Sequence, residues 1–379
     1  MSLIIDALRG IRRLRPSLAL LPLAVLIALP AQDSSAASRQ RRQPVLKKVN
    51  ASAAEVGEFA NFAQWKDAGP FIDRMAEIHG FERDEVRAIL SKVRFVEKAV
   101  QLIKPAPPGR PKNWQAYRAR FVEPLRIQAG VEFWDRHADV LARAEEQYGV
   151  PAEIIVGIIG VETIYGRNTG NFRVMDALAT LAFAYPEAPN RAARMDYFRG
   201  ELENALVYAR EEKLDPFTLL GSYAGAIGWP QFMPGSIRRF AVDFDGDQHI
   251  NLRASPVDAI GSVANFLLQH GWNKGDPAVF PATVSDNDSW AGFLKQGLQA
   301  RNSIDELAAG GVLPATTVPA DLRYGLVDLQ NGSEPTEYWI GTNNFFAITQ
   351  YNRSFFYAMS VIELGKSVRV ARSTQTSLR

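Results

Sequence analysis

From residue 56 onward, apolar positions recur mostly at the three- and four-residue intervals of an α-helix. The clearest segments predict helices over 135–148, 152–163, 174–183, 194–210, 256–270 and 353–368. After Gly271, proline, aspartate and asparagine mark turns between short runs of strand character. These runs lie around 278–284, 326–329, 338–340 and 346–350. The pattern therefore predicts a mainly α protein, of the α+β class, with a small β-containing segment at 275–345.

The N-terminal residues have the order of an export signal. Four arginines between Arg9 and Arg15 precede an apolar run over 17–31. That run contains two prolines and is short for a membrane-spanning helix. Residues 32–55 are polar and basic, which is typical of a flexible linker. We therefore expect residues 1–31 to be a signal peptide that directs the protein to the periplasm, and the alternative is an uncleaved membrane anchor.

The bulk composition excludes several classes of protein. The chain has 379 residues, of which 47% are hydrophobic and 22% are charged, so it is globular and long enough for more than one domain. It has no cysteine, which excludes disulfides, thiolate metal sites and a cysteine nucleophile. Removing residues 1–31 takes away four positive charges and one negative charge, so the net charge of +2 becomes −1. A nearly neutral body argues against nucleic acid as a partner and leaves a glycan possible.

The segment 152–163 is apolar on every face of the predicted helix, which indicates that the helix is buried. Glu162 lies at its C-terminal end. Burial favours the neutral form of a carboxylic acid and raises its pKa. A glutamic acid with a raised pKa is what protonation of a glycosidic oxygen requires. The alternative is a buried Glu162 paired with a nearby arginine such as Arg167.

Two further segments have the composition of a polymer-binding surface. Residues 221–234 alternate small side chains with aromatic and amide side chains, so that a ligand can approach the backbone while Ser222 and Gln231 offer hydrogen bonds. A tightly packed connection between helices is the alternative for this segment. In the second segment, 350–357, we expect Asn352 to be the N-cap of the last helix, a role compatible with facing a substrate.

Residues 243–250 resemble the first eight positions of an EF-hand loop. The ligand positions 1, 3, 5 and 7 are occupied by Asp243, Asp245, Asp247 and the backbone carbonyl of His249. Gln248 stands at position 6, where the EF-hand has glycine, and Ala254 stands at position 12 in place of glutamate. We expect a structural calcium ion here, and the alternative is an acidic surface turn without metal.

Several long motifs, in order along the chain, resemble those of the B-type lytic murein transglycosylases. They are the segments 150–163, 176–181, 221–234, 257–265 and 351–357. The resemblance covers residues 60–370 and implies a lysozyme-like helical core flanked by an α domain and a small β-containing domain. We accordingly expect an N-terminal α domain at 56–135, the core with its EF-hand-like loop at 136–274, a β-containing insert at 275–345, and a C-terminal cleft segment and helix at 346–379.

The family implies cleavage of the β-1,4 bond between N-acetylmuramic acid and N-acetylglucosamine, with formation of a 1,6-anhydro ring, in cell-wall turnover and remodelling. Glu162 would act first as acid and then as base. By residue matching, Ser222 and Asn352 would hold the N-acetyl and sugar groups. The residues that would line the saccharide cleft are Tyr117, Gln231, Tyr351 and Tyr357. Phe266 stands where the family has a cleft tyrosine, and Asp258 would close the calcium site, although the stretch 253–255 carries one residue more than usual.

Two other functions stay open at this point. A lysozyme-like hydrolase needs a second carboxylate, for which Asp176 and Asp243 are candidates, although Asp176 also suits a cap of the following apolar helix. A glycan-binding scaffold with an inactive site is opposed by the presence of Glu162 together with the expected sugar-binding side chains. The expected partners are peptidoglycan glycan strands and cell-wall synthases.

Overall fold

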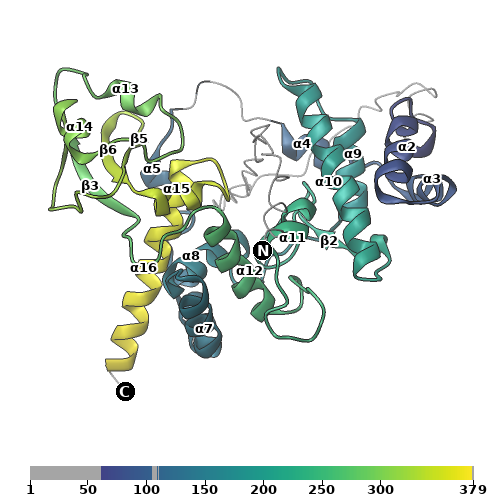
Figure 1. Cartoon of the computed structure of the whole chain (residues 1–379), viewed down its shortest axis with the longest axis horizontal. Helices are drawn as coiled ribbons and strands as arrows, with labels where there is room; N and C mark the ends of the chain where they lie inside the picture. The colour runs from purple at the N-terminus through teal and green to yellow at the C-terminus, as the bar shows by residue number, and fades with distance from the viewer. Residues whose placement is uncertain (1–60, 105–108, 110, 378–379) are drawn as a thin grey trace, which may run out of the picture.

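The computed structural model describes residues 61–104, 109 and 111–377. The expected signal peptide at 1–31 and linker at 32–55 therefore lie outside the described residues. Within the described part, helices dominate and two antiparallel sheets complete the fold, which confirms the α+β prediction. The four-stranded sheet and helices α2 and α3 lie at opposite ends of the long axis, with α8 and α12 between them (Figure 1).

The chain up to the central helix folds into short helices with identifiable ends. They are η1 (Phe62–Gln64), α2 (Ala68–His79), α3 (Arg83–Lys92), α4 (Glu97–Ile103), α5 (Trp114–Arg118), α6 (Pro124–Arg136) and α7 (Ala138–Tyr148). The carboxylate of Glu123 accepts two backbone N–H groups at the start of α6. The helix predicted over 135–148 begins only at Ala138, because His137 leaves helical geometry and separates α6 from α7.

The central helix α8 (Ala152–Thr163) has the predicted bounds and is buried along almost its whole length. It packs against α16 (Phe355–Ser377) at very short range. A Cβ on Gly157 would lie 2.3 Å from the carbonyl oxygen of Val361, so only glycine permits this approach. The helix that presents Glu162 is therefore fixed by backbone-to-backbone packing.

Further helices lie between α8 and α16 in the chain, and α12 among them packs against α8. They are α9 (Val174–Phe183), α10 (Arg191–Glu211), η2 (Pro216–Thr218), α11 (Pro234–Phe240), α12 (Pro256–Gln269) and α15 (Asn343–Thr349). A two-stranded sheet pairs β1 (Phe172–Arg173) with β2 (Leu220–Gly221). Among the described residues, no helix combines the length and apolar character needed to cross a membrane.

The β-containing segment forms a four-stranded antiparallel sheet in the order β4-β3-β6-β5. Its elements are β3 (Val279–Val284), α13 (Ala291–Leu294), α14 (Ile304–Ala309), β4 (Val312–Pro314), β5 (Gly325–Asn331) and β6 (Glu334–Gly341). Three of these strands were predicted, whereas β4 is only three residues long and was not. The sheet has its own small apolar cluster around Tyr324 and Ile340.

Two sequence expectations near the C-terminus are wrong. Residues 346–350 were expected to form a strand, but 346–349 belong to α15 and Gln350 is its C-cap; the N-cap Thr342 accepts a hydrogen bond from the Asn344 backbone N–H. A short apolar run without alternation fits either element, and burial on all sides selects the helix here. Asn352 is not the cap of the last helix, because the Tyr357 backbone N–H bonds to the hydroxyl of Ser354 at 3.3 Å.

Candidate active site

Glu162 stands in the last turn of α8 with its side chain partly accessible. The hydroxyl of Tyr357, from α16, donates a hydrogen bond of 2.6 Å to Glu162 Oε1. Burial raises the pKa of Glu162 to about 7, although the bond from Tyr357 acts in the opposite direction. At neutral pH this carboxyl group can therefore both lose and gain a proton, as general acid–base catalysis requires.

Among the residues that the structure describes, no arginine forms an ion pair with Glu162. Arg167 forms an ion pair of 3.5 Å with Glu132 instead, and both side chains are about half exposed. Asp176, the candidate second carboxylate, bonds to the guanidinium of Arg173 and accepts the Arg94 backbone N–H at 3.0 Å. Asp176 therefore joins two segments of the fold, and it neither caps α9 nor stands free to attack a sugar.

Aromatic side chains form one wall around Glu162. The rings of Tyr351 and Tyr357 are stacked with centroids 6.2 Å apart, and the Tyr351 hydroxyl donates to the Pro230 carbonyl at 2.7 Å. Burial, followed by the charge of Glu162, raises the pKa of Tyr117 to about 12, so this phenol stays protonated and can donate. Phe266 is only 6% exposed and packs edge-on against Tyr351, with ring centroids 4.8 Å apart, so it adjoins this wall, and its contact with a sugar stays a prediction.

The glycine-rich segment 221–234 is a folded loop with internal hydrogen bonds. The Ser222 hydroxyl accepts the Ala226 backbone N–H at 3.1 Å. The amide nitrogen of Gln231 donates to the carbonyls of Thr169 and Gly228 at 3.2 and 3.0 Å. Because its donors are used by the backbone, Gln231 offers a ligand chiefly its amide oxygen.

Asn352 differs from Ser222 and Gln231 because its side-chain oxygen is buried and has no hydrogen-bond partner among the described residues. The residue is 9% exposed, and its Oδ1 has no hydrogen-bond partner in the structure. A buried carbonyl oxygen without a donor costs free energy. Asn352 is therefore well suited to a ligand N–H group.

The acidic loop, residues 243–258, brings three carboxylates together. Oxygen atoms of Asp243, Asp245 and Asp258 all lie within 4.8 Å of one another. Asp258 is 1% exposed, and its Oδ1 and Oδ2 accept the backbone N–H groups of Phe244 and Asn251 at 2.9 and 2.8 Å. Asp258 thus joins the other two carboxylates despite the extra residue at 253–255, and its role as the closing calcium ligand stays a prediction.

One expected calcium ligand lies outside this cluster, whereas the expected ligand atom of His249, its backbone carbonyl oxygen, stays a prediction. Asp247 is outside the cluster, and its Oδ1 accepts the backbone N–H of His249 at 2.8 Å. The ring of His249 lies 3.3 Å from the Glu212 carboxylate. Gln248, however, has φ 72°, the left-handed conformation for which an EF-hand uses glycine. The backbone therefore follows an EF-hand course even though the residue at this position is unfavourable.

Comparison with known proteins agrees with this geometry. A family model described as the transglycosylase SLT domain matches residues 61–366. The membrane-bound lytic murein transglycosylase B of Escherichia coli (strain K12) is 45% identical over 324 residues, covering 83% of this chain and 85% of that protein. The chain belongs to the lytic transglycosylase family.

Solved structures of lytic transglycosylases have the same fold. The catenated lytic transglycosylase SltB1 from Pseudomonas aeruginosa has a TM-score of 0.75 and 44% identity, covering 82% of this chain and 100% of that one. The Escherichia coli lytic transglycosylase Slt35 in complex with calcium has a TM-score of 0.73 and 44% identity, covering 85% and 98%. The protein is accordingly an enzyme that cleaves peptidoglycan by lyase chemistry.

Sequence reasoning about this lytic transglycosylase missed two residues at the site. Thr163 follows Glu162, is fully buried, and donates from its hydroxyl to the Trp229 carbonyl at 2.9 Å. Trp229 lies within the glycine-rich loop, but its large ring gave no signal that separated it from other aromatic side chains. This contact joins segments more than sixty residues apart, which no local pattern reveals.

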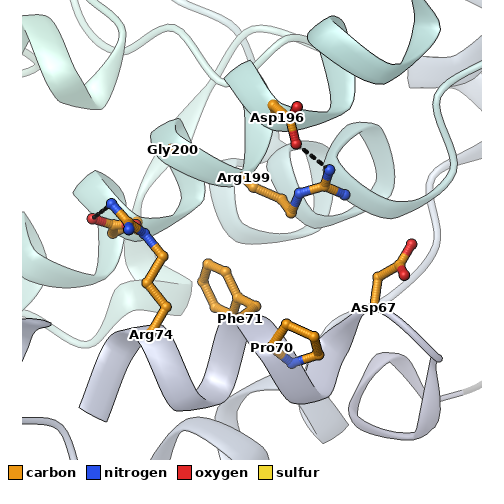
Figure 2. Close-up of a pocket in the computed structure, with 8 residues that line it drawn as sticks. Asp67, Pro70, Phe71, Arg74, Asp196, Arg199 and Gly200 are labelled. Atoms are coloured by element: carbon orange, nitrogen blue, oxygen red, sulfur yellow. Dashed lines mark hydrogen bonds and ion pairs between the residues drawn. The ribbon is translucent and has the colours of Figure 1, made fainter. Parts of the chain in front are cut away.

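A hollow apart from Glu162 lies between α2 and α10, with a volume of about 430 Å³. Figure 2 shows Phe71 and Pro70 on one side and Arg199 on the other, with Asp67 at one end. Arg199 pairs with Asp196, and Arg74 pairs with Glu203 at 2.7 Å. This hollow is therefore lined by two ion pairs and Asp67, and Glu162 is not among its lining residues.

Proposed function

We propose that Glu162 alone carries both proton transfers of the lytic transglycosylase reaction between N-acetylmuramic acid and N-acetylglucosamine. The observation that best supports this proposal is the environment of the Glu162 carboxyl group. Glu162 is partly accessible and has a pKa raised to about 7, while the candidate second carboxylates bond elsewhere, Asp176 to Arg173 and Asp243 to backbone N–H groups of its own loop. Since a hydrolase of the usual kind needs two carboxyl groups, the single one favours the lyase reaction over hydrolysis.

In the first step, protonated Glu162 gives its proton to the glycosidic oxygen while the β-1,4 bond breaks. Because Tyr357 donates to Oε1, the proton to be transferred belongs on Oε2, which lacks this bond. In the second step, the carboxylate takes the proton of the muramyl C6 hydroxyl, and that oxygen closes onto C1. The product is a 1,6-anhydro ring, no water is consumed, and Glu162 is again protonated.

The sugar would be held by side chains from three segments. The unpartnered Oδ1 of Asn352 suits the N–H of an N-acetyl group, and the partly exposed Ser222 hydroxyl lies in the loop across the site. The phenol of Tyr117 and the amide oxygen of Gln231 add one donor and one acceptor. Tyr351 and Tyr357 would hold Glu162 and the loop in place as well as lining the cleft.

The acidic loop is proposed to hold a structural calcium ion. The oxygen atoms of Asp243, Asp245 and Asp258 are the hard ligands that Ca²⁺ prefers, and the backbone follows an EF-hand course at Gln248. The buried carboxylate of Asp258 fits such an ion because its charge is compensated only by backbone N–H groups. A bound ion would supply positive charge to this cluster, and the catalytic steps do not pass through it.

The site of action is the cell envelope, as for the membrane-bound relative. We place the protein in the periplasm on its basic and apolar N-terminal sequence. Glycan strands are its substrate, and cell-wall synthases stay proposed partners.

Cleavage of purified sacculi in ¹⁸O-labelled water, followed by mass spectrometry of the products, tests the reaction type. A lyase gives muramyl ends that are one water lighter and carry no label. Hydrated ends that carry ¹⁸O would establish a hydrolase, and release of no product at all would favour a glycan-binding scaffold.

A further inference from the structure

Trp229 lies against the turn that ends the catalytic helix. This turn begins at Ile164, and Ile164, Tyr165 and Gly166 all have positive φ, at 53°, 55° and 80°. A Cβ on Gly166 would lie 2.6 Å from the indole ring of Trp229, so the ring is packed directly onto the turn backbone. An isoleucine and a tyrosine in the left-handed region are strained and persist only where the surroundings hold them.

Thr163 joins the same turn to the backbone of Trp229. Its buried hydroxyl donates to the Trp229 carbonyl at 2.9 Å and accepts the Gly166 backbone N–H at 3.0 Å. One hydroxyl therefore connects the residue after Glu162, the strained turn and the glycine-rich loop. The position of Glu162 depends on this connection because Thr163 is its immediate neighbour.

The opposite side of Trp229 is held by the acidic loop. Its backbone N–H donates to the Leu252 carbonyl at 2.9 Å, and its indole Nε1 donates to the Arg253 carbonyl at 3.0 Å. Trp229 thus lies between the acidic loop and the catalytic turn, with hydrogen bonds to both.

The two accepting carbonyls are oriented by the carboxylates that we propose as calcium ligands. Just before them, the Asn251 N–H donates to Asp258 Oδ2 at 2.8 Å. Just after them, the Ser255 hydroxyl donates to Asp245 Oδ2 at 2.7 Å. An ion that fixes Asp245 and Asp258 would therefore fix the segment 251–255 from both ends.

We propose that Trp229 is a positioning residue for the transglycosylase reaction, which transmits the state of the acidic loop to the turn behind Glu162. Occupancy of the loop by a divalent cation then steadies the strained turn through the Leu252 and Arg253 carbonyls, the indole and Thr163. The inference rests on the proposed roles of Glu162 and of the acidic loop.

Hydrogen–deuterium exchange of the purified protein, with and without calcium, tests this on peptides that cover 160–170 and 243–258. The variant is Trp229→Phe, which removes the indole donor and keeps an aromatic ring. Trp272→Phe is the matched control, because Trp272 is also buried and donates from Nε1 to a backbone carbonyl, that of Gly149 at 3.0 Å. Thr163→Val breaks the same connection from its other side, and circular dichroism verifies that each variant is folded.

We expect calcium to slow exchange in both peptides about threefold or more in the wild type and in Trp272→Phe. In Trp229→Phe and Thr163→Val, calcium should still slow the 243–258 peptide but not the 160–170 peptide. In the presence of calcium, Trp229→Phe should lower kcat roughly tenfold and leave KM nearly unchanged. The reason is that the substitution disturbs the placement of Glu162 and removes no contact with the sugar. Trp272→Phe should change neither constant.

The proposal is overturned if calcium slows the 243–258 peptide alone in the wild type, or if Trp229→Phe keeps the effect on the 160–170 peptide. It is also overturned if calcium alters neither peptide. Exchange reports on the turn whatever the reaction is, so a failure of the proposed chemistry would appear separately, as wild-type products that carry a water.

Discussion

The Tyr357 hydroxyl donates to Glu162 Oε1 at 2.6 Å across 195 residues of sequence, and this bond opposes the effect of burial on the acid. Removal of the bond by Tyr357→Phe should raise the pKa of Glu162 above about 7. Because the protonated acid starts the reaction, the wild-type kcat/KM should fall as the pH rises above about 7, and in the variant this fall should move to higher pH. A pH–rate profile checks this, and a fall at unchanged or lower pH would contradict it.

Glu162 should also destabilise the folded protein when it is ionised. Its folded pKa of about 7 exceeds the ordinary value of 4.5, so the folded state binds the proton more tightly than the unfolded chain does. The contribution of Glu162 to the free energy of unfolding is therefore greatest below about pH 4.5, and it decreases as the pH rises to about 7. Glu162→Gln removes this loss, so it should be more stable than the wild type at pH 8 by about 1–3 kcal/mol, and nearly equal at pH 4. Urea unfolding at the two pH values measures the difference, and an equal difference at both would be inconsistent with a raised pKa.

Gln248 should weaken cation binding by the acidic loop. Its φ of 72° costs a side-chain-bearing residue conformational energy that glycine avoids. Gln248→Gly should therefore raise the calcium affinity several-fold, by about 1 kcal/mol. Isothermal titration calorimetry measures the calcium affinity of each variant. Asp258→Asn is the comparison variant, and we expect it to lose calcium binding. Calcium binding that is equally tight in Asp258→Asn would exclude this carboxylate as a ligand.

Ser360 should be a position where a substitution stabilises the protein. It is fully buried in α16, and its hydroxyl has no hydrogen-bond partner in the structure. Ser360→Ala should increase the free energy of unfolding by about 1 kcal/mol. Thr180 is equally buried, but its hydroxyl accepts the Val96 N–H at 3.0 Å, so Thr180→Val should decrease stability by about 1–3 kcal/mol. A thermal melt that gave both variants the same sign of change would refute this distinction.

Sequence patterns were most informative where a local rule decides the structure. Pro151 and the all-apolar run that follows it predicted both ends of α8 and the burial of the helix that carries Glu162, because these features follow from the local sequence. The prediction of a strand at 346–350 was wrong because a five-residue apolar run fits either a helix or a strand. Only the surrounding structure decides between the two. Asn352 and Ser354 can both cap a helix, and the local sequence does not decide between them. In the structure, Ser354 is the residue that caps α16.

Other parts of the site depend on contacts between distant segments. The bond from Tyr357 to Glu162 and the position of Trp229 between two loops leave no periodic trace in the sequence. Phe266 matched a family position, and its packing between His270 and Tyr351, with ring centroids 4.0 and 4.8 Å away, is seen only in the fold. The family resemblance identified these segments of the sequence. Only the three-dimensional structure shows which of their side chains lie near Glu162.

The proposal that Glu162 carries both proton transfers is tested most directly by the rate at which Glu162→Gln forms 1,6-anhydromuropeptides from purified sacculi. The amide keeps the size of the side chain and its acceptor for the Tyr357 hydroxyl but cannot transfer the proton. We predict a loss of kcat of about 10²–10⁴-fold or more, with binding of the glycan retained. Anhydro products formed at a rate close to that of the wild type would contradict the assignment and require another acid.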